Sequence, residues 1–531
     1  MELHRDDNLI DNRIKNVLRE KFHLRTLYPY QELVIRTILE SARMFGHNEA
    51  GSVPKHQLVV LPTGSGKSVC FMLPSLLVNG ITIAIYPLLS LMNDQARRMK
   101  ELGVKCAVFK GGQSTQERNE LFRSIEDGSC SFIITNPETL GSASMLSKLC
   151  SSPIALIVID EAHTVVQWGE TFRPAYLDLP HIFNELHPDQ ILAFTATASP
   201  QIIDRITDIM FKGRRPHIVL GNPDRPNITY KTLPSICKIH DIERLFKHNI
   251  ALPAVIFCST RKRCETVAWE LKRRLNPQAI RYYHAGLDKE EREATEKWFY
   301  THPNAILCCT SAYGMGVDKK NIRSVIHYDL STDAESFLQE SGRAGRDNLP
   351  TTSIVIMGIE EQTKVKKIAN DAPFVQLCTV FMRTDMCRRK SLLKIMGYSE
   401  EHCSGCDVCD DNIITEPEGS HEILSLIRCT PFHYTKEQVA FILSGNPIPW
   451  RLYEHLSGHP LFGILDNWEP EDIQEGLQSL QKEGAIKVKK TWPFKNRLYV
   501  SHVCRSHRDF ALFKSSLFNL LSSIRQYGFD M

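Results

Sequence analysis

The sequence predicts an α/β protein with two parallel-sheet domains of similar size in tandem, followed by a smaller helical part. Short apolar runs rich in β-branched residues recur up to about residue 360, with helix-like stretches between them. This pattern is typical of parallel strands that are covered on both faces. Beyond that point the runs stop and a cluster of four cysteines follows. A chain of 531 residues is also too long for one hydrophobic core, so several domains are expected.

Each series of apolar runs predicts the strands of one domain. The polar, proline-containing stretch 212–227 separates the two series, so we place the first domain at 1–215 and the second at 216–362. The predicted strands of the first domain are 58–61, 81–86, 132–135, 156–159 and 191–195, and those of the second are 254–258, 280–283, 305–309, 325–327 and 354–357.

Smaller units are predicted after residue 362. A helix-like segment leads into the cysteines and defines a subdomain at 363–412. An acidic linker leads to 413–505, where a helix at 471–483 is followed by a strand, a turn and a second strand. This order is typical of a winged-helix domain. Residues 506–531 predict a single amphipathic helix.

Composition and charge narrow the class of protein only a little. The net charge of +3 neither demonstrates nor excludes nucleic-acid binding. The N-terminus lacks the apolar core of a signal peptide, and the apolar run at 81–89 contains Pro87 and is too short to cross a bilayer. Scattered cysteines indicate a reducing compartment. We therefore expect no membrane partner, and a cytoplasmic, nucleoid-associated protein in a bacterium or a nuclear one in a eukaryote.

The first predicted strand runs into a glycine-rich loop, 62–68, that predicts a nucleotide site. Glycines let backbone N–H groups close around phosphates, and the N-terminus of the following helix adds a positive dipole. Lys67 would contact the β- and γ-phosphates of ATP, and the Ser68 hydroxyl would bind Mg²⁺. The alternative is a glycine-rich turn before a helix. The predicted cofactor-binding residues of the loop are Thr63, Gly64, Ser65, Gly66, Lys67 and Ser68.

A pair of adjacent carboxylates follows the buried strand 156–159. Asp160 suits Mg²⁺ coordination through water, and Glu161 suits polarising the attacking water. The alternative is helix capping, because acidic side chains favour the first turn of a helix. Together with Lys67, the pair predicts ATP hydrolysis.

Gln339, Arg343 and Arg346 lie on a helix-like segment of the second domain. A spacing of three residues would put both arginines on one side of a helix. They are either surface charges or arginine fingers that stabilise charge on the transferring phosphoryl group. As fingers, they would make hydrolysis depend on closure between the two domains.

Aromatic rings follow the acidic motif. Trp168, Phe172 and Tyr176 are spaced four apart, with Arg173 among them. Rings at this spacing are often core residues, but the Trp-Gly and Arg-Pro breaks favour a loop whose exposed rings stack on bases. We therefore predict that Trp168, Phe172 and Arg173 contact nucleic acid.

The four cysteines follow the pattern C-x15-C-x2-C-x2-C and predict a structural Zn²⁺ site. Disulfides, the alternative, conflict with a reducing compartment. The basic residues that follow the first cysteine, Arg388 and Arg389 among them, would reach phosphates or solvate a helix. The predicted zinc ligands are Cys387, Cys403, Cys406 and Cys409.

Taken together, these segments resemble the RecQ family of DNA helicases, in the second helicase superfamily. The resemblance covers roughly residues 15–500. It implies two RecA-like domains, a zinc-binding subdomain and a winged helix, with ATP- and Mg²⁺-dependent 3′→5′ unwinding. The implied partner is DNA, single-stranded or as tailed or branched duplex. The motifs that carry the resemblance are 62–68, 86–95, 160–163, 168–176, 195–197, 284–286, 314–316 and 339–347.

Three features depart from the pattern of the family. A segment that resembles its adenine-recognition motif keeps Gln31, the residue that recognises adenine, but Leu24 and Tyr28 stand where an aromatic residue and an arginine are usual. The aromatic loop has Glu170 where a histidine linked to coupling of DNA binding and hydrolysis is typical. The chain ends at Met531, so we expect no additional C-terminal nucleic-acid module.

The leading expectation is a DNA helicase that acts in repair or recombination, and two other functions stay open. One is an RNA helicase, because Asp-Glu-Ala-His also names an RNA-acting group; the cysteines and the aromatic loop favour DNA. The other is a DNA-binding or annealing protein that uses ATP as a switch, which Glu170 and the altered adenine motif favour. In the predicted wing, Trp492 and Phe494 either wedge a duplex end or pack.

Overall fold

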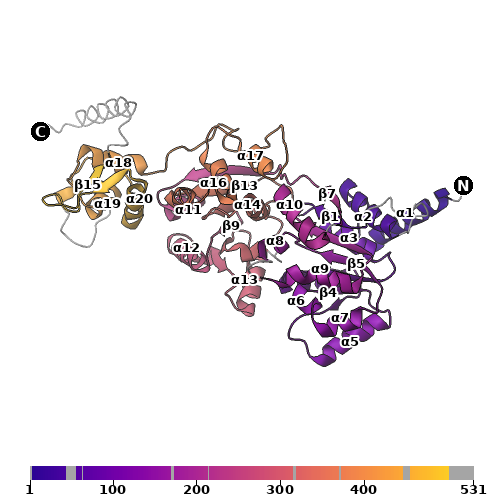
Figure 1. The fold of residues 1–531 in the computed structure, drawn as a ribbon. Coiled ribbons are helices and arrows are strands. Elements are labelled where there is room, and N and C mark those ends of the chain that lie inside the picture. Colours follow the sequence, from indigo (N-terminus) through magenta and orange to yellow (C-terminus); the bar gives the residue numbers. More distant parts are fainter. Residues whose placement is uncertain are drawn as a thin grey trace.

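The structure of the protein is a computed structural model with three parts (Figure 1). The first parallel sheet and its helices lie toward the N-terminus, the second sheet lies in the middle, and a small part with α18–α20 and β15 lies at the other end. In the described part of the chain, no helix has the length and apolar character needed to span a membrane. The described residues are 3–42, 55–62, 64–168, 173–212, 214–314, 319–369, 372–445 and 455–501.

Seven parallel strands form the first sheet, in the order β3-β4-β2-β5-β6-β1-β7. The five strands predicted for this domain are confirmed, whereas the two-residue β3 and the largely exposed edge strand β7 were not predicted. Because β7 pairs with β1, the sheet extends to Leu220, and the predicted domain limit at residue 215 is too early. The strands are β1 (Gln57–Val60), β2 (Ile81–Ile85), β3 (Ala107–Val108), β4 (Phe132–Thr135), β5 (Ile154–Ile159), β6 (Gln190–Thr195) and β7 (His217–Leu220).

Six parallel strands form the second sheet, in the order β10-β11-β9-β12-β13-β8. The five predicted strands are again confirmed. The edge strand β8 was not predicted, because its buried and accessible residues alternate and it lacks a continuous apolar run. The strands are β8 (Ile228–Pro234), β9 (Ala254–Phe257), β10 (Ile280–Tyr283), β11 (Ile306–Cys309), β12 (Ser324–His327) and β13 (Thr351–Met357).

Helices cover both faces of the first sheet, as the continuous apolar strands require. On β5, Ile157 and Ile159 belong to one core cluster, and Leu156 and Val158 belong to the cluster on the opposite face. The helices of this domain are α1 (Leu3–Glu20), α2 (Pro29–Ser41), α3 (Lys67–Ser75), α4 (Leu89–Glu101), α5 (Thr115–Glu126), α6 (Pro137–Leu140), α7 (Ala143–Leu149), α8 (Thr164–Trp168), α9 (Ala175–Leu186), α10 (Pro200–Ile206) and the π-helix η1 (Thr207–Phe211). Those of the second are α11 (Lys238–Lys247), α12 (Arg261–Arg274), η2 (Pro277–Ala279), α13 (Lys289–Thr301), η3 (Ser311–Gly314), α14 (Ala334–Ser341) and α15 (Ile359–Val365).

The cysteine region, with α16 (Pro373–Met382) and α17 (Arg388–Ile395), is attached to the edge strand β8. Tyr230 of β8 forms a parallel bridge with Cys406. The carboxylate of Asp407 accepts hydrogen bonds from the backbone N–H of Thr232, at 2.7 Å, and from Nε of Arg388, at 3.0 Å. The region therefore covers an edge that would otherwise expose unpaired backbone groups.

Arg388 and Arg389 are 1% and 0% exposed, so the prediction that they reach phosphates or solvate a helix is wrong. Arg388 pairs with Asp407 and donates to backbone carbonyl groups. Arg389 pairs with Asp224, and its guanidinium lies 5.0 Å from the centre of the Tyr230 ring. Buried charges persist only when they are paired. Arg389 joins α17 to the segment between the sheets, and Arg388 joins it to the cysteine loop and to α16.

The described residues of the C-terminal part form the helices α18, α19 and α20 and a two-stranded antiparallel hairpin. The predicted order of helix, strand, turn and strand is confirmed here, and the winged-helix assignment stays a prediction. The predicted tail helix at 506–531 lies outside the described residues. The elements are α18 (Ser420–Cys429), α19 (Lys436–Ser444), α20 (Pro470–Glu483), β14 (Ile486–Val488) and β15 (Leu498–Val500).

A shared core joins this C-terminal part to the second sheet domain. Ile236, beside α11, belongs to the same buried cluster as Ile473 of α20. Trp468 stacks on the ring of His240 with a centroid distance of 4.0 Å. The hydroxyl of Ser479 donates to the carbonyl of Ile236 at 2.8 Å. The two parts therefore pack as one body.

A buried ion pair lies inside this interface. The guanidinium of Arg274, on α12, donates two hydrogen bonds of 2.7 Å to the carboxylate of Asp472 and one of 3.1 Å to Glu243. Burial opposes ionisation of Asp472, but hydrogen bonds from His240 and Arg274 outweigh it and lower the pKa of its carboxyl to about 2. Both partners are charged at neutral pH, so either one alone would be a buried unpaired charge.

We predict that Arg274→Ala loosens the C-terminal part by about 3 kcal/mol, because it leaves Asp472 buried without its cation. Hydrogen exchange of the α20 backbone, measured by mass spectrometry, should become much faster. The matched control is Arg273→Ala, since that side chain is 44% exposed and its pairs should contribute less than about 1 kcal/mol. Equal exchange rates in the two variants would contradict the importance of the buried pair.

Candidate active site

The glycine-rich loop joins β1 to α3, as predicted. Gly64 and Gly66 have φ angles of 87° and 76°, in the left-handed region that glycine adopts without strain. Gly66 is the residue before the first helical residue, Lys67, so the helix N-terminus opens toward the loop. The ammonium of Lys67 donates to the carbonyl of Leu61 at 3.2 Å. Thr63, a predicted site residue, lies outside the described residues.

Gln31 contacts this loop from α2. Its side-chain nitrogen donates to the carbonyl of Ser65 at 2.9 Å, and its side-chain oxygen accepts from the backbone N–H of Tyr28, also at 2.9 Å. The segment that contains Gln31 and the glycine-rich loop were predicted separately as nucleotide-binding, and the structure brings them together. They lie about thirty residues apart in the chain.

The acidic pair lies at the carboxyl end of β5, beside the loop. Burial and the neighbouring Glu161 raise the pKa of Asp160. Burial opposes ionisation of Glu161 as well, but Lys67 and His163 hold its pKa below the ordinary value. Glu161 also has a φ angle of 52°, an unusual backbone conformation for a residue other than glycine. The raised pKa of Asp160 means that its carboxylate favours a bound proton. A divalent cation bound there would replace that proton and neutralise the same charge.

A chain of polar contacts crosses from the first sheet domain to the second. Gln339, on α14, donates to the hydroxyl of Thr197 at 3.0 Å and lies 3.4 Å from Nε2 of His163. Nδ1 of His163 lies 2.9 Å from the hydroxyl of Thr195, and burial lowers the pKa of its ring. Thr195, Thr197 and His163 lie in the motifs that carry the family resemblance, but no site role was predicted for them. Their side chains meet only through tertiary packing.

Arg343 and Arg346 follow the end of α14 at Ser341, so the prediction that they lie on a helix is wrong. Their charges nevertheless act on the acidic pair, because both help to lower the pKa of Glu161. Burial and the neighbouring Arg346 lower the pKa of Arg343 to about 10. Among the described residues, Nε of Arg343 is buried and has no hydrogen-bond partner. The arrangement therefore offers cationic groups from both domains to an anion at their junction.

The aromatic segment is only partly described. Trp168 ends α8, and its side chain and all of Phe172 lie outside the description of the structure. Tyr176 belongs to α9 and is fully buried, so the prediction of an exposed ring is wrong at this position. Arg173 donates to the carbonyl of Pro87 and lies 3.6 Å from the carboxylate of Glu138.

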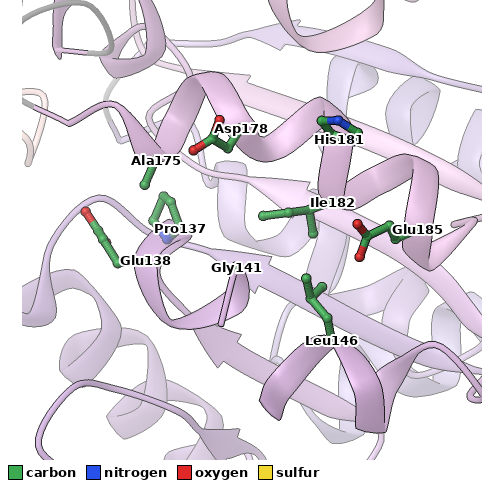
Figure 2. Close-up of a pocket in the computed structure, with 9 residues that line it drawn as sticks. All are labelled: Pro137, Glu138, Gly141, Leu146, Ala175, Asp178, His181, Ile182 and Glu185. Carbon is green, nitrogen blue, oxygen red and sulfur yellow. The ribbon is translucent and has the colours of Figure 1, made fainter. Parts of the chain in front are cut away.

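A pocket of about 330 Å³ lies between α6, α7 and α9 (Figure 2). Its floor contains Leu146 and Ile182, and carboxylates surround them. Acidic side chains repel nucleic-acid phosphates, so this pocket does not extend the predicted DNA site. The acidic lining residues are Glu138, Asp178 and Glu185.

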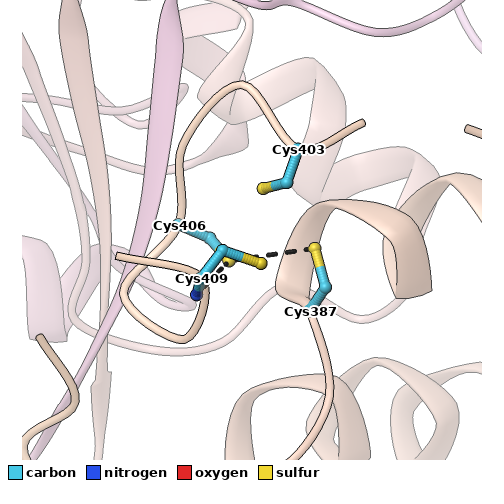
Figure 3. A group of neighbouring side chains, drawn as sticks. All are labelled: Cys387, Cys403, Cys406 and Cys409. Atoms are coloured by element: carbon cyan, nitrogen blue, oxygen red, sulfur yellow. Dashed lines mark hydrogen bonds between the residues drawn. The ribbon is translucent and has the colours of Figure 1, made fainter. Parts of the chain in front are cut away.

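The sulfur atoms of the four predicted zinc ligands converge (Figure 3). All lie within 4.8 Å of one another, and those of Cys387 and Cys406 are 3.8 Å apart. Tetrahedral zinc with Zn–S distances of about 2.3 Å separates its sulfurs by about 3.8 Å. Burial opposes deprotonation of Cys406, but backbone N–H groups of Cys409 and Arg388 hold the pKa of its thiol below the ordinary value. The cluster is compatible with zinc.

The two rings of the hairpin differ. Trp492 is 88% exposed, whereas Phe494 packs on Phe432 with a centroid distance of 5.6 Å. Lysines line the neighbouring groove along β14, which gives this hairpin a basic surface. Phe494 therefore packs on one side while it stays 47% exposed, and Trp492 is accessible to a ligand.

Comparisons with known proteins agree with this geometry. The DEAD/DEAH box helicase family matches residues 28–206, and the helicase conserved C-terminal domain matches residues 237–348. The chain is 30% identical over 443 residues to the ATP-dependent DNA helicase RecQ of Bacillus subtilis, covering 81% of this chain and 74% of that one. It is 31% identical over 462 residues to the protein of the same name from Pasteurella multocida, covering 83% and 71%.

Solved structures with low identity share the fold. The DUF1998 helicase MrfA bound to DNA and AMPPNP has a TM-score of 0.53 at 20% identity, over 92% of this chain and 61% of that chain. The DEAD-box helicase Mss116 bound to ssRNA and UDP-BeF has a TM-score of 0.54 at 18% identity, over 69% and 78%. The two parallel sheets are thus RecA-like domains, and the chain belongs to the RecQ family of ATP-dependent DNA helicases.

Proposed function

We propose that the protein couples ATP hydrolysis to 3′→5′ movement on single-stranded DNA and to duplex unwinding, in repair or recombination. The observation that carries the proposal is the contact of Gln339 with Thr197, because it joins the two RecA-like domains at the acidic pair. A site split between two domains changes shape when its nucleotide is hydrolysed, which is how turnover becomes movement. The relatives named as DNA helicases support DNA as the partner.

The proposed roles in hydrolysis follow from position. Lys67 and Ser68 would bind the phosphates and Mg²⁺, Asp160 would hold the ion, and Glu161 would orient the attacking water. When bound, Mg²⁺ neutralises charge on the phosphates. Arg343 and Arg346 would stabilise charge on the transferring phosphoryl group. Gln31 and the loop residues 63–66 complete the proposed nucleotide site, and Trp168, Phe172 and Arg173 the proposed DNA contacts.

The proposed domains follow the sheets. The first RecA-like domain ends at Leu220, the second runs to about residue 362, and a zinc-binding subdomain at 363–412 precedes a winged helix at 413–505. Four sulfurs within 4.8 Å of one another support Zn²⁺ as the ion held by the cysteine cluster. Its proposed role is structural, because the cluster lies against β8 and four thiolates leave no open coordination position.

The proposal predicts that single-stranded DNA stimulates ATP hydrolysis and that the protein separates a duplex with a 3′ single-stranded tail. Lys67→Ala should lower both activities by about 100-fold or more, because it removes a cation from the phosphates. Strand displacement and phosphate release measure the two activities.

Two results would replace this function with an alternative. Stronger stimulation by RNA than by DNA would favour an RNA helicase. Strand displacement that is equal in the wild type and Lys67→Ala, or absent from both, would favour an ATP-switched binding or annealing protein.

Arg343→Ala should lower the rate of ATP hydrolysis by about 1,000-fold while ATP still binds, because an arginine finger acts on the transition state. Calorimetric titration with a non-hydrolysable analogue measures binding, and phosphate release measures hydrolysis. Arg343→Lys keeps the charge but loses the planar fork of donors, so it should recover only part of the rate. Equal loss of binding and hydrolysis would contradict the finger role.

Cys403→Ser should lower the zinc content measured by elemental mass spectrometry and weaken DNA binding, because metal binding contributes folding free energy. Basal ATP hydrolysis should be retained, since the cluster lies outside the nucleotide site. Cys150→Ser is the matched control, because Cys150 is exposed and belongs to the first domain. Full zinc content and normal DNA binding in Cys403→Ser would contradict the proposal.

A further inference from the structure

The second sheet ends in an edge strand, β10, whose outer side is open. Among the described strands, β10 pairs with β11 alone. The opposite edge strand, β8, is instead covered by the cysteine region through the bridge between Tyr230 and Cys406. An edge strand carries a row of backbone N–H and C=O groups with which an extended segment of another chain can pair. The outer side of β10 therefore offers backbone hydrogen bonds to a partner strand.

A pocket of about 270 Å³ lies along this edge, and residues of α12, β10 and α13 line it. The two helices cover opposite faces of the sheet. Leu271 of α12 belongs to the same core cluster as Cys308 of β11, whereas Phe299 of α13 belongs to the cluster that contains Leu307. Adjacent residues of a strand point to opposite faces. A pocket lined by both helices and by β10 thus lies at the edge of the sheet, between its two faces.

Two cations flank the edge strand, one on each face. The ammonium of Lys272 lies 5.9 Å from the centre of the Tyr282 ring, on the α12 face. The guanidinium of Arg281 lies 4.7 Å from the centre of the Trp298 ring, on the α13 face. Both cations and the single carboxylate of Glu291 line the pocket, yet neither cation forms an ion pair in the part of the chain that the structure describes. Their charges are therefore available to an anionic group.

An exposed tryptophan extends this surface along α12. Trp269 is 61% exposed and lies three residues before Lys272, so the two side chains are neighbours on the helix surface. Tryptophan is highly buried on average in folded proteins, and it is enriched among the residues that supply most of the affinity of protein interfaces. The ring therefore marks this side of the second domain as a contact surface for a partner protein.

The charges at the edge determine which partner it accepts. Pairing with a second copy of β10 would bring two copies of Arg281 together, and like charges across a strand pair are destabilising. Nucleic acid carries phosphates but has no peptide groups with which to continue the sheet. In an added strand, two adjacent acidic side chains would point to opposite faces and reach Lys272 and Arg281. An apolar residue beside them would contact Leu287 and Ala294 in the pocket.

We propose that the edge of β10, together with the pocket and Trp269, binds an extended acidic segment of a partner protein by strand addition. The segment would hydrogen-bond to the outer side of β10, and its carboxylates would pair with Lys272 and Arg281. None of these residues belongs to the proposed nucleotide, DNA or zinc sites. The docking site is therefore additional to the helicase activity and does not depend on it.

The test selects peptides and then changes the protein. Short random peptides displayed on phage would be selected on the full chain, and the affinity of the enriched peptides would be measured by fluorescence anisotropy. We expect adjacent acidic residues next to an apolar one. Lys272→Gln combined with Arg281→Gln should weaken binding by about tenfold or more, and Trp269→Ala by about fivefold or more. Lys148→Gln, which removes an exposed lysine of the first domain, is the matched control and should bind as the wild type does.

N-methylated peptides test the pairing with β10 directly. Alternate residues of an added strand direct their backbone N–H and C=O groups toward the neighbouring strand. Methylation of the nitrogens that face β10 should abolish binding, whereas methylation of the nitrogens between them should have little effect. This comparison uses the wild-type protein, so it decides the inference even if a variant does not fold.

Four outcomes would overturn the inference. Equal effects of the two methylation patterns would mean that the peptide does not add a strand. Unchanged affinity in the variant that lacks both cations would mean that the peptides bind elsewhere. Failure to enrich acidic peptides would mean that the edge does not select its partner by charge. If the same variant instead lost affinity for single-stranded DNA and kept its affinity for the peptides, the surface would be a nucleic-acid contact.

Discussion

The hydrogen bond from Gln339 to Thr197 is the contact on which the rest of the proposed site depends. The loop lysine and the acidic pair lie on the first sheet domain, and the two arginines lie on the second. Without that contact, the carboxylates of the first domain would lie apart from the arginines of the second. With it, Glu161 stays ionised beside four basic residues, among them Arg343, and an anion can enter between the domains. In the proposed function, anion binding and domain closure would therefore be one process.

The second RecA-like domain also contacts both the cysteine region and the described part of the C-terminal region. Arg389 joins the cysteine region to the segment before β8, and Arg274 joins α12 to α20. Both are buried arginines whose charges are matched by carboxylates, so each contact has one favourable geometry. The C-terminal hairpin, with Trp492 exposed, packs through the same core on the domain that carries the arginines. Movement of that domain against the first one would move the hairpin with it.

Physical differences between strands explain which ones could be predicted. Central strands such as β5 are buried on both faces, so their sequence is a continuous apolar run. The edge strand β7 pairs with a neighbour, β1, on one side only, and it exposes Ile218 and Leu220. Its sequence therefore resembles that of a loop. Contacts between distant side chains could not be predicted either. The sequence around Arg388 and Arg389 does not indicate which carboxylates neutralise them. In the structure these are Asp407 and Asp224.

The sequence by itself determined the order of the domains, the phosphate-binding loop, the acidic pair and the four cysteines, because each depends on residues close together in the chain. Tertiary structure decided how side chains from distant segments are buried and which of them contact one another. It placed Arg343 in a loop after α14 instead of on a helix and buried Tyr176. The reason is that local spacing constrains a turn of backbone, whereas burial and charge pairing are set by residues that only the complete fold brings into contact.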